Sequence, residues 1–177
     1  KMTNGRRVPT AEDLTVVRMV LSGLANKRLV SAIIGKGVNA VGVSGEDGGM
    51  LCADPRDAET FGLVGKTPVV KAEIIQALLR EGNLPVISPV SRCSDESLSD
   101  ALNVNGDDAA AAIAIALKAD ELLFVSDVAG VREASGESLG EIDSDRTRGL
   151  IESGTAAGGV AAKLESALFA IEGGVRR

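Results

Sequence analysis

The sequence predicts an α/β protein built on a parallel sheet. Its central stretch, Leu102–Arg132, reads as a polar loop, an alanine-rich helix, the apolar run Leu122–Val125 and a second loop. Loop, helix, buried strand and loop form the repeating unit of such folds. Two other helix candidates are followed by apolar runs, Val38–Ser44 and Leu84–Val90. We therefore expect three strands that each come after a helix.

The first helices lie near the start of the chain. Thr10 offers an N-cap with Asp13 three residues later, a variant of the capping box. The apolar period of Leu14–Leu24 predicts an amphipathic helix that Gly23 would interrupt. A second helix is expected over about Asn26–Ile34.

The next segment is expected to be rich in strands. After Val38–Ser44 and a glycine turn, Met50–Ala53 reads as a short return strand. Residues 54–59 read as a loop, and the glycines and proline of Phe61–Val70 favour a bent edge strand. Lys71–Arg80 then carries one apolar helical face and ends before Gly82.

The rest of the chain alternates between loops and helices. Leu84–Val90 predicts a buried strand, and Ser91–Ala101 a polar loop that leads to the central helix. After Arg132 the expected elements are a hairpin over Glu133–Gly140, a helix over Asp143–Ser153, and a last helix over Val160–Ile171 after the small residues Gly154–Gly159.

Composition excludes several classes of protein. The 177 residues suit one domain, and 19 Lys plus Arg against 25 Asp plus Glu give a net charge of −6. A nucleic-acid binder needs clustered cations or stacking aromatics. This chain is acidic overall and has only three Phe and no Trp or Tyr, so that class is disfavoured. The sequence has no histidine and only two widely spaced cysteines, which argues against zinc chemistry and histidine-based triads. With no signal peptide and no membrane-length apolar run, we expect a cytoplasmic protein.

Polar residues gather where ligands bind in open α/β sheets, beyond the carboxyl ends of strands. Asn103, Asn105 and Asp107 precede the central helix, and Asp127 follows the apolar run. The positive end of a helix dipole favours Asp107, whose simplest role is to support the helix. The asparagines also suit plain turn formation.

Three other features are compatible with anionic ligands. Thr155–Gly159 precedes a helix whose N–H groups could meet a phosphate, although no Walker A loop occurs in the sequence. Lys163 lies about one turn into that helix, and Arg7 in a glycine turn could grip a carboxylate through its planar fork. Taken singly, each of these residues also fits a solvated surface.

In combination and in order, these motifs resemble a known family. NGRRV, SGEDGG, ALNVNGDDAAAAIAIAL, SDVAGV and AGGVAAKLESALFAIEGG are similar to the amino-acid kinase family, in particular to its N-acetylglutamate kinase branch of arginine biosynthesis. The resemblance implies a three-layer αβα sandwich around a mainly parallel sheet, and a homodimer. It also implies transfer of the γ-phosphoryl of MgATP to the side-chain carboxylate of N-acetyl-L-glutamate, giving an acyl phosphate.

The resemblance assigns roles residue by residue. Arg7 is expected to clamp the substrate's α-carboxylate, Asn103 to hydrogen-bond the substrate, and Asn105 to contribute there. Lys163 would neutralise charge on the transferring phosphoryl, and Asp107 would organise the catalytic lysines.

The nucleotide segments follow from the same resemblance. The residues expected to hold ATP are Ser126, Asp127, Val128, Ala129, Gly130, Val131, Arg132, Thr155, Ala156, Ala157, Gly158 and Gly159. The resemblance implies ATP and Mg²⁺ as cofactors, and no metal ligand is assigned within the chain. About 1–105 would form the substrate-binding and dimer-forming part, and about 106–177 the nucleotide-binding part.

The sequence also departs from the family. The family's opening K-x-G-G strand and H-G-G-G loop are absent, and the family continues past the position of Arg177. We expect one kinase domain that is incomplete at both ends, with a naturally shortened, inactive relative as the alternative.

Two other functions stay open. One is a kinase of carrier-linked aminoadipate in lysine biosynthesis, and the other is a non-catalytic regulator that binds nucleotide or amino acid. A Rossmann dehydrogenase is disfavoured because no G-x-G-x-x-G follows a strand.

Overall fold

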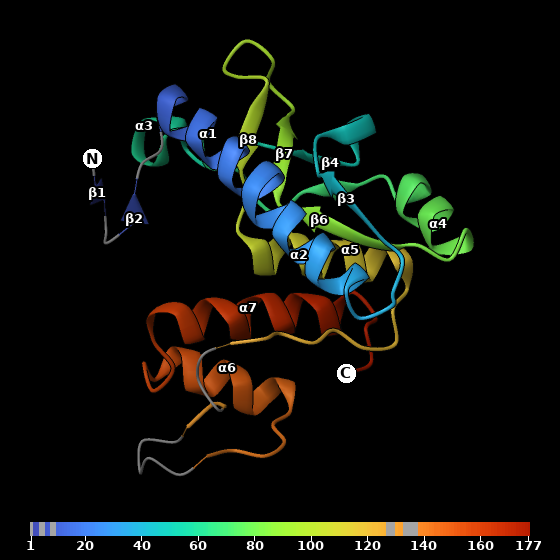
Figure 1. The fold of residues 1–177 in the computed structure, drawn as a ribbon. Helices are drawn as coiled ribbons and strands as arrows, with labels where there is room; N and C mark the ends of the chain where they lie inside the picture. Colours follow the sequence, from blue (N-terminus) through green and yellow to red (C-terminus); the bar gives the residue numbers. More distant parts are fainter. Residues whose placement is uncertain (1, 4–5, 8–9, 127–129, 133–137) are drawn as a thin grey trace. The chain divides into compact units, whose positions relative to one another are not determined.

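The computed structural model describes residues 2–3, 6–7, 10–126, 130–132 and 138–177. The chain forms two compact units, Lys1–Leu117 and Lys118–Arg177, whose helices and strands are drawn in Figure 1. None of the helices in these described ranges has the length and apolar character needed to span a bilayer.

The first unit mixes helices and strands, which confirms the predicted α/β class. In chain order its elements are β1 (Met2–Thr3), β2 (Arg6–Arg7), α1 (Ala11–Val17), η1 (Arg18–Ala25), α2 (Asn26–Ile34), β3 (Ala40–Ser44), η2 (Asp47–Gly49), β4 (Leu51–Ala53), α3 (Ala58–Phe61), β5 (Val69–Val70), α4 (Glu73–Arg80), β6 (Leu84–Ser88), β7 (Val90–Cys93), β8 (Ala101–Asn103) and α5 (Gly106–Leu117).

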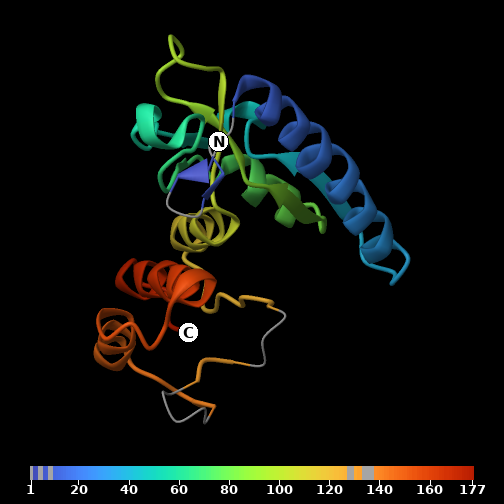
Figure 2. The same ribbon diagram turned by 90° about the vertical axis from the view of Figure 1, so that its left-hand side faces the viewer.

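Helices α1, η1 and α2 form one continuous helical stretch (Figure 2). The predicted capping box is confirmed: Thr10 Oγ1 accepts from the Asp13 N–H at 3.2 Å, and Asp13 Oδ2 accepts from the Thr10 N–H at 3.0 Å. The predicted break at Gly23 is wrong. Gly23 lies inside η1, a π-helical segment in which the Asn26 N–H bonds back to the Leu21 carbonyl. A glycine costs a helix only about 1 kcal/mol, which packing on the strands can offset.

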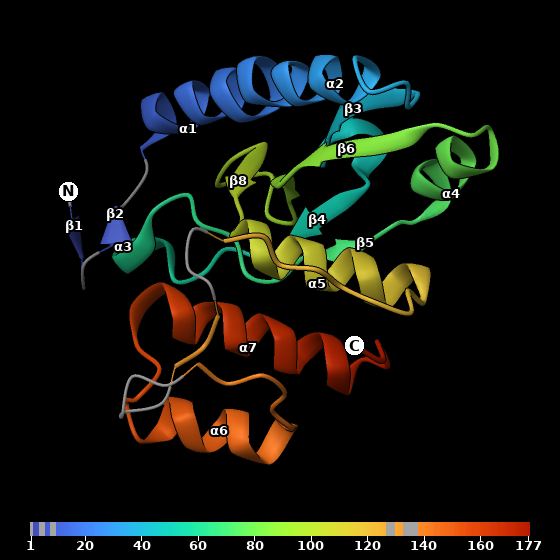
Figure 3. The ribbon, with the colours of Figure 1, turned by 60° about the horizontal axis from the view of Figure 1, so that its bottom comes forward.

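The strands of this unit form two sheets beyond the small β1–β2 pair. Strands β3 and β6 are parallel, in register from Ala40↔Leu84 to Ser44↔Ser88. The second sheet has the order β5-β4-β7-β8, with β4 and β7 parallel and the other pairs antiparallel. The stretch α1–η1–α2 covers one side of these strands and α5 lies on the other (Figure 3). This is the helix–sheet–helix layering that the family resemblance implies.

The pairing predicted for the strand Met50–Ala53 is wrong. Met50–Ala53 does contain a strand, β4, but β4 pairs with β5 and β7 and does not return along β3. Gly48 and Gly49 of η2 both have positive φ, a conformation that suits glycine and turns the chain into the second sheet.

The expected loop Ser91–Ala101 is also partly wrong. Its ends belong to β7 and β8, which pair antiparallel, and Ser91 is fully buried. Leu84–Val90 divides at Pro89, which separates β6 from β7. Small buried side chains such as Ser91 hide a strand from a hydrophobicity pattern.

The edge strand predicted over Phe61–Val70 is confirmed only in part. Val69–Val70 pairs as β5, and Val64 and Gly65 form isolated bridges to Asn103 and Pro55. Helix α3 begins inside the expected loop of residues 54–59. The Asp57 side chain caps α3 by accepting from the Thr60 N–H. An aspartate cap thus outweighs the weak strand pattern that follows it.

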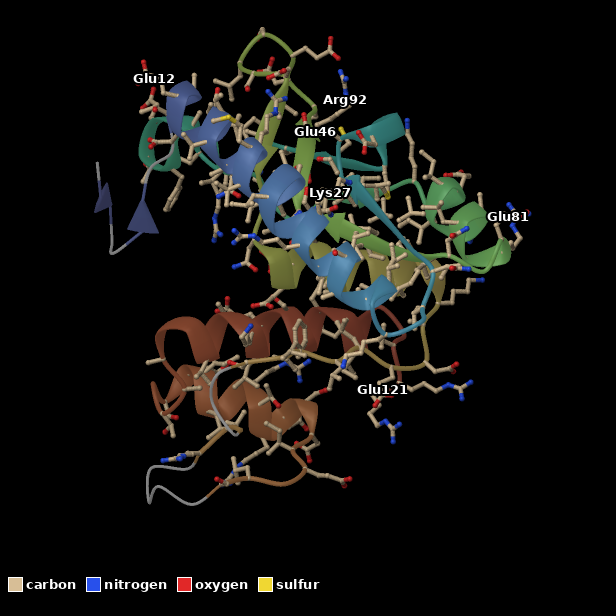
Figure 4. The ribbon with its side chains drawn as sticks, viewed as in Figure 1. Glu12, Lys27, Glu46, Glu81, Arg92 and Glu121 are labelled. Carbon is tan, nitrogen blue, oxygen red and sulfur yellow. The ribbon has the colours of Figure 1, made fainter. Side chains whose placement is uncertain are left out.

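A buried asparagine joins the helical stretch to the β3–β6 sheet. The Asn26 amide donates to the carbonyls of Val43 (3.3 Å) and Val86 (2.8 Å), one on each strand. A Cβ on Gly42 would lie 1.9 Å from Asn26 Oδ1, so only glycine admits this close approach. Lys27, labelled on the helical stretch in Figure 4, adds a 2.7 Å bond to the Gly42 carbonyl.

The second unit is built on α6 (Ser144–Glu152) and α7 (Gly158–Glu172), which confirms both predicted helices. Asp143 caps α6 by accepting from the Arg146 N–H at 2.7 Å. The expected hairpin is described only at its flanks, where Arg132 and Ser138 form an antiparallel bridge, because residues 133–137 lie outside the described ranges.

The predicted buried strand Leu122–Val125 is wrong. Residues 121–126 form no strand, and Leu123 and Val125 are 78% and 85% exposed. The Leu122 N–H bonds to the Arg177 carbonyl at 2.7 Å. No strand in the described part of this unit pairs with the run, and a strand is stable only with a neighbour that accepts its hydrogen bonds.

Candidate active site

Two asparagines lie at the end of β8 and in the loop that leads to α5. Leu102 and Val104 are buried, whereas Asn103 is half-buried and Asn105 exposed. This alternation follows from the two-residue period of extended chain. Asn103 therefore shares a face of β8 with Ala101, on the side opposite Leu102 and Val104.

Asn105 has a structural role that the sequence already allowed. Its Oδ1 accepts from the N–H groups of Asp107 (2.8 Å) and Asp108 (3.3 Å), which caps the start of α5. Asp107 is half-buried in the first turn, where the helix dipole stabilises its carboxylate. A substrate contact by Asn105 would then use the amide nitrogen, because the oxygen is already bonded.

Arg7 lies in β2, where its backbone pairs with Met2. Its side chain lies outside what the structure describes, so its approach to Asn103 stays a prediction.

The second unit contains a pocket of about 240 Å³. Its walls come from the extended segment before residue 127, the short segment 130–131 and one face of α7. The lining residues are Phe124, Ser126, Gly130, Val131, Val160, Lys163, Leu164 and Ala167. The lining is mostly apolar, with a hydroxyl and an ammonium as its polar groups, a composition typical of small-molecule sites.

Lys163 supplies the positive charge of this pocket. Its Nζ lies over the ring of Phe124, 5.9 Å from the ring centroid. Val160, Lys163, Leu164 and Ala167 follow the spacing i, i+3, i+4, i+7, so they share one face of α7. A half-buried cation among apolar walls can attract an anionic group such as a phosphate, because charge interactions are stronger away from water.

The small residues before α7 are only partly available to a ligand. The Ala156 N–H donates to the Leu150 carbonyl at 2.9 Å, and Ala156 is buried in the core of this unit. Ala157 is the N-cap of α7, and Gly158 and Gly159 form its first turn, where N–H groups lack intrahelical acceptors. These glycines and Thr155 do not line the pocket.

The structure brings together some of the predicted nucleotide residues. Ser126, Gly130 and Val131 line the pocket together with Lys163, the predicted catalytic lysine, whereas Arg132 does not. Asp127, Val128 and Ala129 lie outside the described residues. Asp107 and Lys163 belong to different units, and their cooperation stays a prediction.

Sequence reasoning missed the apolar part of the pocket, namely Phe124, Val160, Leu164 and Ala167. The helical period counted from Lys163 would have identified the last three. Phe124 gave no signal of its own, since an aromatic residue in an apolar run reads as core.

Within the described ranges, no three Asp, Glu or Cys side chains gather closely enough to hold a metal ion. Mg²⁺ is commonly held by substrate phosphates with one or two carboxylates.

Known proteins resemble this chain over nearly all of its length. Acetylglutamate kinase of Paracoccus denitrificans is 47% identical over 176 residues, which cover 99% of this chain and 57% of that protein. Acetylglutamate kinase of Cereibacter sphaeroides is 43% identical over 99% of this chain and 59% of that protein. The chain thus spans somewhat less than three fifths of the length of these two relatives.

A solved structure shares the fold. The crystal structure of smu.665 from Streptococcus mutans matches with a TM-score of 0.87 and 29% identity, over 99% of this chain and 70% of that one. The family model described as "Amino acid kinase family" matches residues 2–177. Architecture and sequence agree, and the chain belongs to the amino acid kinase family.

Proposed function

We propose that the protein carrying this chain transfers the γ-phosphoryl of MgATP to the side-chain carboxylate of N-acetyl-L-glutamate, within arginine biosynthesis. The observation that carries the proposal is the 47% identity, over 99% of the chain, to a relative named acetylglutamate kinase. The pocket around Lys163 supports the nucleotide half of the reaction.

The chemistry suits a chain without histidine. A carboxylate acceptor is already ionised at neutral pH, so no general base has to remove a proton. Phosphoryl transfer depends mainly on holding acceptor and donor in line and on neutralising the charge of the transferring group. Lysine, arginine and amide groups can do both.

Each candidate residue then has a defined task. Lys163 neutralises charge on the transferring phosphoryl, and Asp107 orients the lysines that act on it. Arg7 holds the substrate's α-carboxylate, and Asn103 and Asn105 hydrogen-bond the acylated amino acid. Asn103 suits this task because it ends β8 directly before the loop to α5 and is half-buried, unlike its buried neighbours Leu102 and Val104.

The nucleotide is proposed to lie against the pocket of the second unit. Its base or ribose would contact Ser126, Gly130 and Val131, and its phosphates would lie toward Lys163 and the first turn of α7. The predicted contacts of Asp127–Arg132 and Thr155–Gly159 belong to the same proposal.

The test measures ATP-dependent acyl phosphate, trapped as a hydroxamate, in the protein that carries this sequence. Lys163→Ala should lower kcat by about a hundredfold or more, because one charge-stabilising group is lost from the transition state. The matched control is Glu165→Ala, an exposed residue of the same helix. A folded Lys163→Ala variant with unchanged kcat would remove Lys163 from the site.

Acceptor comparison separates the remaining alternatives. We expect turnover with N-acetylglutamate and none with glutamate, aspartate or acetylaminoadipate. Turnover with none of these acceptors, in a protein that still binds ATP, would favour the carrier-linked aminoadipate kinase or the regulator.

We further propose a homodimer formed through the helical stretch α1–η1–α2. Val16, Val20 and Leu24 are 53%, 42% and 51% exposed along it. These three residues are four positions apart. Four residues are slightly more than one turn of an α-helix and slightly less than one turn of a π-helix, so the π-helical segment η1 keeps the three side chains on one side of the stretch. Glu12 and Arg28 lie at equal distances along the sequence from Val20. A second copy crossing antiparallel at Val20 would therefore pair opposite charges at both ends.

Light scattering of the purified protein tests this interface. Leu24→Glu should convert a dimer to a monomer, because it places a charge at an apolar interface. Leu123→Glu, at an exposed leucine of the second unit, should leave the mass unchanged. A monomeric wild-type protein, or a dimer that survives Leu24→Glu, would contradict this assignment.

A further inference from the structure

Phe124 is the one aromatic side chain that lines the described pocket. It lies in an extended segment whose neighbours Leu123 and Val125 are exposed, while Phe124 itself is half-buried against α7. Its ring faces Lys163 Nζ at 5.9 Å from the centroid. This distance falls within the roughly 6 Å range over which an aromatic face attracts a cation.

The ring addresses a difficulty that any phosphate-binding lysine has. A lysine ammonium is carried on a long flexible stem, and holding it in one place costs side-chain entropy. An aromatic face attracts the cation through its quadrupole and does not cancel its charge. It also adds no hydrogen-bond acceptor that would compete with phosphate oxygens.

Resting on the proposed function, we infer that Phe124 is a positioning residue for Lys163: its ring holds the ammonium at the pocket without neutralising the charge that attracts the nucleotide phosphates. The same ring forms part of the apolar wall, so one side chain shapes the pocket and orients its cation. Lys163 touches the phosphates, and Phe124 acts through Lys163.

The ring–ammonium interaction has a spectroscopic signature that is independent of activity. Protons above an aromatic face are shielded, so the ε-methylene protons of Lys163 should resonate upfield of those of the other lysines. Lys163→Arg assigns the signal by removing it. Phe124→Leu should shift it to the position of the other lysines, and Phe124→Trp should keep it upfield, because tryptophan offers the strongest face for a cation.

Phe169→Leu is the matched control. It removes a ring from α7, but Phe169 is 43% exposed and does not line the pocket. The Lys163 signal and the turnover should both stay at the wild-type level in this variant. A Lys163 signal that is not upfield in the wild type, or that Phe124→Leu leaves in place, would overturn the inference.

Kinetics tests the positioning role. Phe124→Leu should lower kcat about three- to tenfold with little change in the KM for ATP, and Phe124→Trp should restore most of the loss. If Phe124→Leu moves the Lys163 signal to the position of the other lysines but leaves kcat unchanged, the positioning role is overturned.

A failure of the proposed function can be distinguished from a failure of this inference. If the wild-type protein forms no acyl phosphate, the kinase assignment fails, and a titration with MgATP decides about Phe124. The positioning role is supported if MgATP moves the Lys163 signal in the wild type and Phe124→Leu changes the size of that movement. A signal that MgATP does not move would overturn it.

Discussion

Two apolar runs that look alike in sequence have opposite fates in the two units. Ala40–Ser44 forms β3, which pairs with β6 over its whole length. Leu122–Val125 pairs with no strand in the described part of its unit and exposes Leu123 and Val125. Both runs follow a helix, and both are rich in apolar side chains. An apolar run can therefore become a strand, but its sequence alone does not decide whether it does.

The difference lies in what the rest of each unit supplies. In the first unit the partner strands come from segments far along the sequence, and the helical stretch and α5 cover both sides. In the second unit the buried core consists of Leu150 of α6, Leu164 of α7 and Ala156 between the two helices. The described residues of that core include none of Leu122–Val125. Burial follows from available partners more than from composition.

Truncating one leucine in each unit gives the largest expected contrast. Leu102 is fully buried, so Leu102→Ala should lower the free energy of unfolding by about 2–5 kcal/mol through weaker packing and a cavity. Leu123 is 78% exposed, and Leu123→Ala should change the free energy of unfolding by less than about 0.5 kcal/mol. Urea unfolding measures the free energy of unfolding of each variant. Hydrogen exchange at the Asn103 amide, which bonds to the Leu63 carbonyl, reports on the stability of the first unit. Equal effects of the two substitutions would break the comparison.

A pair of glycines should give a somewhat smaller contrast of opposite sign. A Cβ on Gly42 would meet Asn26 Oδ1 at 1.9 Å and Lys27 Nζ at 2.7 Å, so Gly42→Ala should destabilise the first unit by about 2–3 kcal/mol. Gly149 lies inside α6 with nothing within 4 Å of the same point. Gly149→Ala should stabilise the second unit by up to about 1 kcal/mol through helix propensity. Thermal unfolding of both variants checks the signs, and a neutral Gly42→Ala would disprove the close helix–strand packing.

The same contrast explains what could be predicted from the sequence. Most helices were predictable because their signals are local, as in the Thr10–Asp13 capping box; the one-turn helix α3 was missed. Strand pairing depends on distant segments, so the partner of β4 and the fate of Leu122–Val125 were missed. Gly23 misled because a π-helical segment has no simple sequence signature.

The candidate site divides along similar lines. Lys163, Ser126, Gly130 and Val131 belong to motifs and were predicted from the sequence. Phe124 was missed because a phenylalanine in an apolar run has the same appearance whether it packs in a core or faces a lysine. The contacts of Arg7 stay a prediction.

The smallest expected effect concerns two arginines, one in each unit, that each bridge two carboxylates. Arg18 donates to Glu46 at 2.5 Å and to Asp100 at 2.9 Å, whereas Arg148 of α6 donates to Asp145 and to Glu172 of α7. Figure 4 labels Glu46 beside the helical stretch. The hydrogen bond from Arg18 lowers the pKa of Asp100 below its ordinary value of 3.8.

This shift fixes the sign of a pH dependence. The folded-state pKa of Asp100 lies below the unfolded value, so its stabilisation is present above about pH 4 and is lost as the pH falls through the folded pKa. The Asp100 side chain is 72% exposed, so Asp100→Asn should cost well under about 1 kcal/mol at pH 7. The difference in urea midpoint between wild type and variant should become smaller as the pH falls below about 4, and about 1 M salt should reduce it at pH 7. A difference that persists unchanged at pH 3 would mean that Asp100 acts through packing and not through its charge.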